Sequence, residues 1–382
     1  MGVDINMKIA FFTDTYFPNV DGVVFAMESY RKEFEKKGHE VYIFCPGTKE
    51  DKKRNTNPRV FYYMASEFKP YPDYKLAIFP FSSITKVRKL KIDIIHCHAL
   101  ATMGLAGYLA SKTLKIPCVA TYHTQVSEAT HYISKGKTFN KLTKSAVWKY
   151  CKWYYNLFDA VTTPSEYMGK ILKKYNVNSQ VFPNGINTKR FQYLESSKTK
   201  RKLGLEKYKI AFHVGRLVKE KNIDLIIDSA KSVEKEIPNI KFVFAGDGPA
   251  RNYYEKRIKE KKVEHLFLFL GMIDQKELPK LYSMADVYIF PSRFDTQGLV
   301  AIEAMSCGLP IIGIKNSAVE NTIDEGKNGY IFNNNIPSFI FAIKKALKFK
   351  TPLQYSMNTA KKYSKEKMAE KMLNLYKSLI KK

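Results

Sequence analysis

KIAFHVGRLVKEKN, residues 209–222, begins with an apolar run that predicts a buried strand and continues into a loop with Gly215, Arg216 and Lys221. The same order of apolar run and loop recurs in FVFAGDG (242–248), LFLFLG, VYIFPS and PIIGI, and each run is followed by a helix-like segment. Alternation of strands and helices predicts a parallel sheet with helices on both faces. This half of the chain is therefore expected to be a doubly wound α/β domain.

The same rhythm runs through the N-terminal half. KIAFFTD (8–14) predicts its first strand, and HEVYIFCPG, DIIHCH, PCVATYH and AVTTPS predict further strands. A polar, lysine-rich stretch at 187–202 separates the two series. We therefore predict two doubly wound Rossmann-like domains, 1–190 and 195–363, facing across a ligand-binding cleft. A basic helix at about 364–382 is expected to pack back on the first domain.

Composition limits the possible partners. The 382 residues contain 64 Lys and Arg against 36 Asp and Glu, and this net charge of +28 narrows the partners to nucleic acid, an anionic membrane or phosphorylated small molecules. The five cysteines are scattered without a Cys-x-x-Cys pair, which disfavours a disulfide framework and indicates a reducing cytoplasm. No apolar run approaches the roughly 20 residues of a spanning helix, and no signal peptide is expected.

PSRFDTQGLVAIEAMSCGLP, residues 291–310, is the most informative segment. A strand ends at its start, a polar loop follows, and a helix is expected to begin at Gly298. The backbone amides of Gln297, Gly298 and Leu299 would then point outward toward a phosphate group. Glu303 lies among apolar residues of that helix, so it needs a partner such as a sugar or ribose hydroxyl.

Other candidates are weaker when taken one at a time. Gly22 would let an anion approach a helix start, but an ordinary turn glycine fits as well. Arg216 and Lys221 could bind a diphosphate, or could be solvated loop cations. His123, at a strand end, could donate a hydrogen bond to a substrate or be structural. No two aspartates lie two residues apart, and the His-Cys-His run at 96–98 has no third ligand nearby, so neither a metal site nor a metal cofactor is predicted.

The segment 135–158 is rich in lysine and aromatic residues and contains both tryptophans. Projected as a helix, its apolar residues span about half of the circle, while the lysines, with Trp148 among them, occupy the remainder. Such a helix predicts binding to an anionic membrane surface, although a helix packed on its own domain with solvated lysines fits equally. No nucleic-acid-binding module surrounds it, so nucleic acid is not a predicted partner. The residues predicted to face the membrane are Lys141, Lys144, Trp148, Lys149, Lys152 and Trp153.

These motifs, in this order, resemble the retaining GT-B glycosyltransferases of glycosyltransferase family four. The resemblance covers nearly the whole chain, from the Gly22 loop through TYHT and FPNGI to HVGRLVKEKN, AGDGP and DTQGLVAIEA. Within the family, DTQGLVAIEA is similar to the Thr-Gln-Gly variant of bacterial synthases that glucosylate diacylglycerol. TYHT and ADVYIFPS also look like phosphatidylinositol mannosyltransferases.

The resemblance implies roles for individual residues. Arg216 and Lys221 would clamp the donor diphosphate, Glu303 would bind the ribose hydroxyls, and His123 would hydrogen-bond the donor sugar. Asp295 stands where the family normally has the first Glu of a Glu-x7-Glu pair, and this shorter carboxylate leaves the choice of donor sugar open. The implied catalytic residues are His123, Asp295, Arg216 and Lys221. The other implied donor-binding residues are Gly22, Gln297, Gly298, Leu299 and, through the backbone of its loop near the base, Met272.

The implied reaction is retaining transfer of a hexose from a nucleotide-diphosphate sugar, with UDP-glucose favoured, to a membrane lipid such as diacylglycerol. It is expected to need no metal or other cofactor and to take place with the protein held peripherally at the cytoplasmic face of the membrane. One alternative is the same chemistry on a soluble or lipid-linked surface glycan, and a second is a nucleotide-sugar epimerase. The sequence leaves the donor sugar and base, the acceptor and the oligomeric state open.

Overall fold

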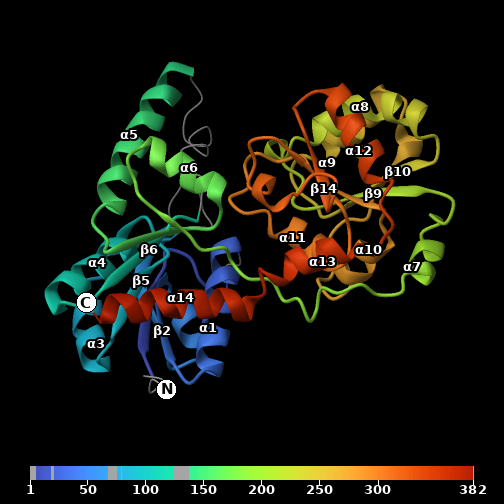
Figure 1. The fold of residues 1–382 in the computed structure, drawn as a ribbon. Coiled ribbons are helices and arrows are strands. Elements are labelled where there is room, and N and C mark those ends of the chain that lie inside the picture. The colour runs from blue at the N-terminus through green and yellow to red at the C-terminus, as the bar shows by residue number, and fades with distance from the viewer. Residues whose placement is uncertain (1–5, 19–20, 68–74, 79, 124–136, 382) are drawn as a thin grey trace. The chain divides into compact units, whose positions relative to one another are not determined.

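The computed structural model divides the chain into two compact units (Figure 1). The N-terminal unit comprises residues 1–185 together with 365–382, and the C-terminal unit comprises residues 186–364. The chain thus leaves the N-terminal unit once and returns to it for its last helix. The residues that the structure describes are 6–18, 21–67, 75–78, 80–123 and 137–381.

An eight-stranded sheet forms the centre of the N-terminal unit, in the order β4-β3-β2-β1-β5-β6-β7-β8. Neighbouring strands are parallel except β3 and β4, which are antiparallel. The strands are β1 (Lys8–Phe12), β2 (Glu40–Gly47), β3 (Val60–Glu67), β4 (Lys75–Ala77), β5 (Ile94–Cys97), β6 (Cys118–Thr121), β7 (Ala160–Thr163) and β8 (Gln180–Val181).

Helices cover both faces of this sheet because successive strand residues point to opposite sides. Ile9 and Phe11 of β1 pack with α1 and α14, whereas Ala10 and Phe12 pack with α3, α4, α5 and α6. The last helix, α14, packs along α1 (Figure 1), where Lys365 lies 3.0 Å from the Glu33 carboxylate. The helices are α1 (Gly22–Lys36), α2 (Lys49–Arg54), α3 (Ser82–Leu90), α4 (Thr102–Leu114), α5 (Lys137–Tyr155), α6 (Glu166–Lys174) and α14 (Lys365–Ile380).

The C-terminal unit is built on a parallel six-stranded sheet in the order β11-β10-β9-β12-β13-β14. Phe212 of β9 packs with α10 and α11 on one face of the sheet. The preceding residue, Ala211, packs with α8, α9 and α12 on the other face. The strands are β9 (Lys209–Val214), β10 (Ile240–Ala245), β11 (Phe267–Phe269), β12 (Val287–Phe290), β13 (Ile311–Ile314) and β14 (Gly329–Phe332). The α-helices are α7 (Ser197–Lys202), α8 (Ile223–Glu236), α9 (Arg251–Glu260), α10 (Leu278–Met284), α11 (Leu299–Ser306), α12 (Ile336–Ala346) and α13 (Gln354–Lys361), and the 3₁₀ helices are η2 (Lys219–Lys221), η3 (Glu264–Leu266) and η4 (Glu320–Thr322).

Helix α5 turns a different face to the core from the one that its projection predicted. Trp148 is only 5% exposed, and its ring stacks on Tyr175 with centroids 3.7 Å apart and planes 6° from parallel. The prediction that Trp148 faces a membrane is therefore wrong. The lysines near Trp148 on the projected helix placed it on the polar side, but Tyr175, just after α6, supplies a flat aromatic partner that outweighs this pattern.

The other residues predicted to face a membrane have mixed positions. Lys149 and Lys152 are exposed, and Trp153 is 52% exposed. Lys144 is partly buried, and the side chain of Lys141 lies outside the described residues. Among the helices that the structure describes, none combines the length and the apolar character needed to cross a membrane.

The two tryptophans of α5 provide a test of this orientation. Trp148→Ala is expected to destabilise the N-terminal unit by about 3–5 kcal/mol, because it removes a buried indole and the stacking of that indole on Tyr175. Trp153→Ala makes the same change at an exposed position and should alter stability by no more than about 0.5 kcal/mol. Denaturant unfolding followed by circular dichroism measures both effects. Equal losses in the two variants would contradict the orientation of α5.

Candidate active site

Each sheet has one place where the strand order reverses, and the predicted polar residues gather at these places. In the N-terminal unit the reversal lies between β1 and β5, and in the C-terminal unit it lies between β9 and β12. Ligands of open α/β sheets bind at the carboxyl ends of the strands at such a switch point. Arg216 and Lys221 follow β9, and Asp295 follows β12, so the switch point brings these segments together.

The loop after β9 is held in place by close backbone contacts. Gly246, after β10, has φ +130°, and a Cβ there would lie 2.1 Å from the Gly215 carbonyl oxygen, so only glycine permits this approach. The Gly246 amide donates to the Gly271 carbonyl at 2.8 Å, which ties in the loop after β11. This packing fixes the backbone from which Arg216 and Lys221 extend.

Lys221 and Asp295 form an ion pair. The Lys221 ammonium donates to Asp295 Oδ1 at 2.5 Å, and the two side chains are 16% and 23% exposed. Burial alone would raise the pKa of Asp295, but the adjacent Lys221 outweighs burial and lowers that pKa below its ordinary value. Asp295 Oδ2 is buried without a hydrogen bond of ordinary geometry, although the Ser292 hydroxyl is close enough to help lower the pKa. Asp295 is therefore ionised at neutral pH.

Two other predicted donor-binding residues are exposed. Arg216 forms no side-chain hydrogen bond or ion pair with the rest of the described chain. Its guanidinium therefore keeps a planar set of donors that suits a phosphate. Met272 follows the loop after β11 and is 79% exposed. Neither position by itself tests the role that the resemblance implies.

Helix α11 begins at a glycine that no other residue could replace without rearrangement. Gly298 has φ +74°, and a Cβ there would lie 2.5 Å from a methyl carbon of Val319 and 2.9 Å from the Phe290 ring. Gln297 is only 5% exposed, and Leu299 begins the helix. The first amides of a helix have no intrahelical acceptor, and its dipole favours an anion there. The local geometry is therefore suited to a phosphate.

Glu303 lies one turn into α11 and is held by a tyrosine. The Tyr282 hydroxyl donates to Glu303 Oε2 at 3.1 Å. Burial raises the pKa of Glu303 to about 7, although the Tyr282 hydrogen bond and the charge of Arg190 act in the opposite direction. At neutral pH this carboxyl group is therefore only partly ionised.

His213, in β9, is a site residue that no sequence pattern indicated. Its Nδ1 donates to the Ile289 carbonyl at 3.0 Å, and its Nε2 is buried with no partner among the described residues. A Cβ at Gly215 would lie 3.5 Å from this Nε2 and 4.0 Å from Lys221 Nζ, so both groups border the same backbone concavity. Burial lowers the pKa of His213 to about 4, so the imidazole is neutral at neutral pH.

Gly22 begins α1 in the N-terminal unit. A Cβ at this position would meet nothing within 4 Å, so the space beside it is open. The Asp21 carboxylate accepts hydrogen bonds from the Val23 and Val24 amides at 2.9 Å each. Two amides of this helix start are thereby already paired with an anionic group. Binding of a phosphate to those amides would require Asp21 to move.

His123 lies just after β6, next to a second histidine that follows β5. The His123 Nε2 is 2.8 Å from the His98 Nδ1. The two residues are neighbours because β5 and β6 pair in parallel. Burial lowers the pKa of His123 to about 4, so its ring is neutral at physiological pH. The sequence singled out His123 as a site residue but considered the run 96–98 only as a metal site.

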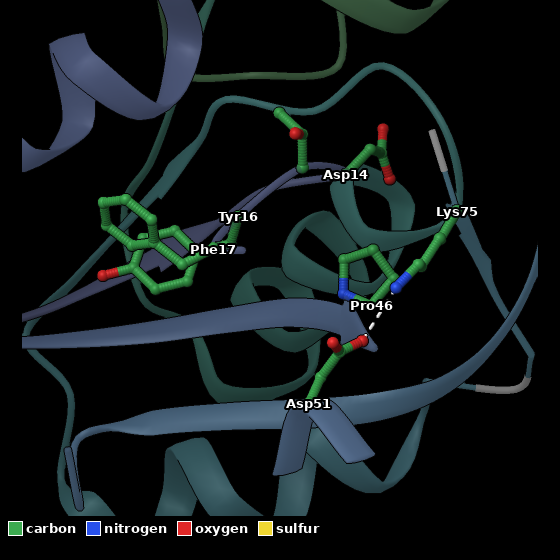
Figure 2. Close-up of a pocket in the computed structure, with 7 residues that line it drawn as sticks. Asp14, Tyr16, Phe17, Pro46, Asp51 and Lys75 are labelled. Atoms are coloured by element: carbon green, nitrogen blue, oxygen red, sulfur yellow. Dashed lines mark hydrogen bonds and ion pairs between the residues drawn. The ribbon is translucent and has the colours of Figure 1, made fainter. Parts of the chain in front are cut away.

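A small pocket opens at the carboxyl ends of β1 and β2. Figure 2 shows Lys75 and Asp51 joined by an ion pair, with Nζ 2.7 Å from Oδ2, and the Phe17 ring beside Tyr16. Phe17 is 41% exposed. The pocket therefore offers an ammonium group and an aromatic surface within the N-terminal unit. Its lining residues are Asp14, Thr15, Tyr16, Phe17, Pro46, Asp51 and Lys75.

Comparison with known proteins assigns the family. Residues 20–190 match the family model described as Glycosyltransferase Family 4, and residues 195–367 match Glycosyl transferases group 1. The chain is 31% identical to the α-monoglucosyldiacylglycerol synthase of Acholeplasma laidlawii, over 98% of both chains. It is 32% identical to the enzyme of the same name from Streptococcus pneumoniae, over 85% of this chain and 75% of that relative.

The fold is also that of solved structures. The crystal structure of Anabaena HepE in complex with UDP superimposes with a TM-score of 0.75 at 16% identity, over 98% of this chain and 100% of the other. The two α/β domains of the present chain have the architecture known as GT-B. The chain belongs to glycosyltransferase family 4, among the relatives of the diacylglycerol glucosyltransferases, and is a glycosyltransferase.

Glu303→Gln is expected to change how stability depends on pH. Because burial raises the pKa of Glu303 from about 4.5 to about 7, the folded protein keeps a proton that the unfolded chain releases earlier. This contribution is complete below about pH 4.5 and is lost as pH rises to about 7, on the order of 3 kcal/mol at most.

Glutamine cannot ionise, so the variant should gain stability relative to the parent protein as the pH is raised from about 5 to about 8. Urea unfolding at both values measures the difference in free energy of unfolding between the two proteins. A difference that stays constant with pH would show that Glu303 does not titrate with a raised pKa.

Proposed function

We propose that the protein transfers a hexose from a nucleotide-diphosphate sugar, with UDP-glucose as the favoured donor, to the hydroxyl group of diacylglycerol. The observation that carries this proposal is the similarity to two α-monoglucosyldiacylglycerol synthases, which extends over 98% of the chain for one of them. The HepE structure was determined with UDP, and this supports a uridine nucleotide in the donor.

The C-terminal unit supplies the groups that we assign to the donor. A Lys ammonium has three N–H donors, so Lys221 can keep its bond to Asp295 and still donate to the diphosphate. Asp295 Oδ2, which is buried without a good partner, is then the acceptor for a hydroxyl of the donor sugar. Arg216 and the N-terminus of α11 add positive potential for the phosphate oxygens.

The proposed chemistry is a retaining, front-face displacement. The bond between the anomeric carbon and the phosphate oxygen breaks, and the acceptor oxygen bonds to the anomeric carbon on the same face. The acceptor proton passes to the departing diphosphate. Arg216, Lys221 and the α11 N-terminus stabilise the negative charge that develops there. No carboxylate is assigned as a covalent nucleophile, because Asp295 is held by Lys221 and Glu303 by Tyr282.

The proposed reaction uses no divalent ion. Neutralisation of the diphosphate is assigned to Arg216, Lys221 and the helix dipole, which can provide this charge without a metal. Within the described residues, no group of three or more His, Cys, Asp or Glu side chains could hold a metal ion. Turnover in the presence of a chelator tests this metal independence directly.

Features of the N-terminal unit favour a lipid acceptor over a soluble glycan. The exposed Trp153 lies beside the exposed Lys149 and Lys152 on α5, a combination typical of a surface that binds an anionic membrane. The net charge of +28 acts in the same direction. The exposed Phe17 ring, which lines the same pocket as Lys75, is suited to the apolar and ester groups of a diacylglycerol. We infer peripheral association with the inner face of the cell membrane.

Labelled donors tested against two classes of acceptor examine this function. UDP-glucose, UDP-galactose, UDP-N-acetylglucosamine and GDP-mannose would each be incubated with diacylglycerol in anionic mixed micelles, and separately with water-soluble glycans. We expect UDP-glucose to label the organic phase, with an α-linked product and unchanged turnover in excess EDTA. Label in the aqueous glycans would overturn the lipid acceptor. A β-linked product would overturn the retaining course of the reaction, and loss of turnover with EDTA would overturn the metal-free mechanism. Donor isomerisation without transfer would show an epimerase.

Arg216→Ala and Lys221→Ala test the stabilisation of the leaving diphosphate. Each is expected to reduce kcat by about 10²- to 10³-fold, the usual effect of removing one group that stabilises transition-state charge. Lys219→Ala is the matched control, because this lysine lies in the same short helix η2 but is exposed and has its ammonium over the Tyr253 ring. Unchanged turnover in both test variants, with product formed normally, would refute the assigned role.

A further inference from the structure

Three histidine rings lie next to one another at the carboxyl ends of β5 and β6. His96 is fully buried, His98 is 6% exposed, and His123 is partly exposed. The ring centroids of His96 and His98 lie 4.0 Å apart, and those of His98 and His123 lie 5.1 Å apart. The His98 amide also donates to the Phe12 carbonyl at 2.7 Å, which places this residue at the switch point between β1 and β5.

The two inner rings differ in their hydrogen bonds. His96 uses both nitrogens, with Nδ1 2.5 Å from the Tyr376 hydroxyl and Nε2 2.6 Å from the Thr121 hydroxyl. His98 uses only Nδ1, which lies 2.8 Å from His123 Nε2. Its Nε2 is buried and has no partner among the residues that the structure describes. The position of one proton therefore decides how the His98–His123 pair is arranged.

Two arrangements of a neutral pair are possible. If His123 Nε2 donated to His98 Nδ1, the His98 proton would sit on Nε2, and a buried N–H would have no acceptor. If His98 Nδ1 instead donates to His123 Nε2, the buried His98 Nε2 carries no proton and is only an acceptor that lacks a donor. Orphaned buried N–H groups are rarer than under-used acceptors, because losing an N–H hydrogen bond leaves a more costly desolvated group. The second arrangement is therefore favoured.

We propose that His98 is a positioning residue that donates its Nδ1–H to His123 Nε2 and thereby fixes the His123 proton on Nδ1. His123 then presents an N–H donor, and the group that it recognises is an oxygen acceptor such as a hydroxyl of the donor sugar. The catalytic part of this inference rests on the proposed function, whereas the proton position does not.

This arrangement restricts what His123 can do. Its Nε2 lone pair is already used by His98, and its Nδ1 carries a proton, so neither nitrogen is available as a general base. His123 can orient a sugar hydroxyl but cannot deprotonate the acceptor. This agrees with transfer of the acceptor proton to the departing diphosphate. Burial lowers the pKa of both His98 and His123, which keeps the pair neutral at physiological pH.

Nitrogen NMR of the ¹⁵N-histidine-labelled protein tests the proton position without any assay of activity. Ring nitrogens with and without a proton have widely separated shifts, and His123→Gln identifies the signals of His123 among the seven histidines. We expect His123 to carry its proton on Nδ1 in the parent protein. A His123 proton on Nε2 would overturn the proposal.

Three variants test whether the hydrogen bond matters for turnover. His98→Leu removes the hydrogen-bond donor to His123 Nε2. Because His123 is then no longer held in its Nδ1–H form, kcat should fall about tenfold or more. His98→Asn places an amide N–H close to the position of Nδ1 and should restore most of kcat. Tyr376→Phe, which removes one hydrogen bond of His96, is the matched control and should leave both kcat and the His123 proton position unchanged.

The outcomes separate the two levels of the inference. Equal turnover in the His98→Leu and parent proteins, with each folded by circular dichroism, would refute the positioning role. A loss that His98→Asn does not recover would show that His98 acts through packing and not through its N–H. If the parent protein transfers no sugar from any donor, the proposed function fails, and the NMR result alone then decides the proton position.

Discussion

The backbone contact between Gly215 and Gly246 is the constraint on which the arrangement of the C-terminal site depends. The loops after β9 and β10 approach so closely that a Cβ at Gly246 would overlap the Gly215 carbonyl. With this loop fixed, Lys221 can reach Asp295, which follows the neighbouring strand β12. A looser loop would hold two flexible cations at a larger entropic cost, and the charge that they offer would be less well directed.

Burial then sets the protonation state of the titratable groups that each unit provides. Asp295 stays ionised because Lys221 compensates for its burial. For Glu303, the Tyr282 hydrogen bond and the charge of Arg190 do not compensate for burial, so its pKa rises to about 7. His213 and His123 are both kept neutral by desolvation. Two carboxyl groups eight residues apart therefore have different charges at neutral pH, because their nearest partners differ.

The order of the motifs predicted much of the fold. The alternation of apolar runs and helix-like segments predicted two parallel α/β units, because each run is long enough for a strand buried on both faces. It also indicated which loops carry the polar residues, since Arg216, Lys221 and Asp295 all follow strands. The predicted orientation of α5 failed at Trp148, because the side that a helix buries depends on what packs against it, here Tyr175.

The sequence by itself determined the fold class, the positions of the strands and the loops at their carboxyl ends, because these follow from local apolar patterns and glycine placement. Only the tertiary structure decided which of these loops are neighbours. Strand order places β12 next to β9 and β6 next to β5, and this brings Lys221 to Asp295 and His98 to His123. Such pairs join residues that are 74 and 25 positions apart, and no local pattern encodes a contact that arises from the order of strands in a sheet.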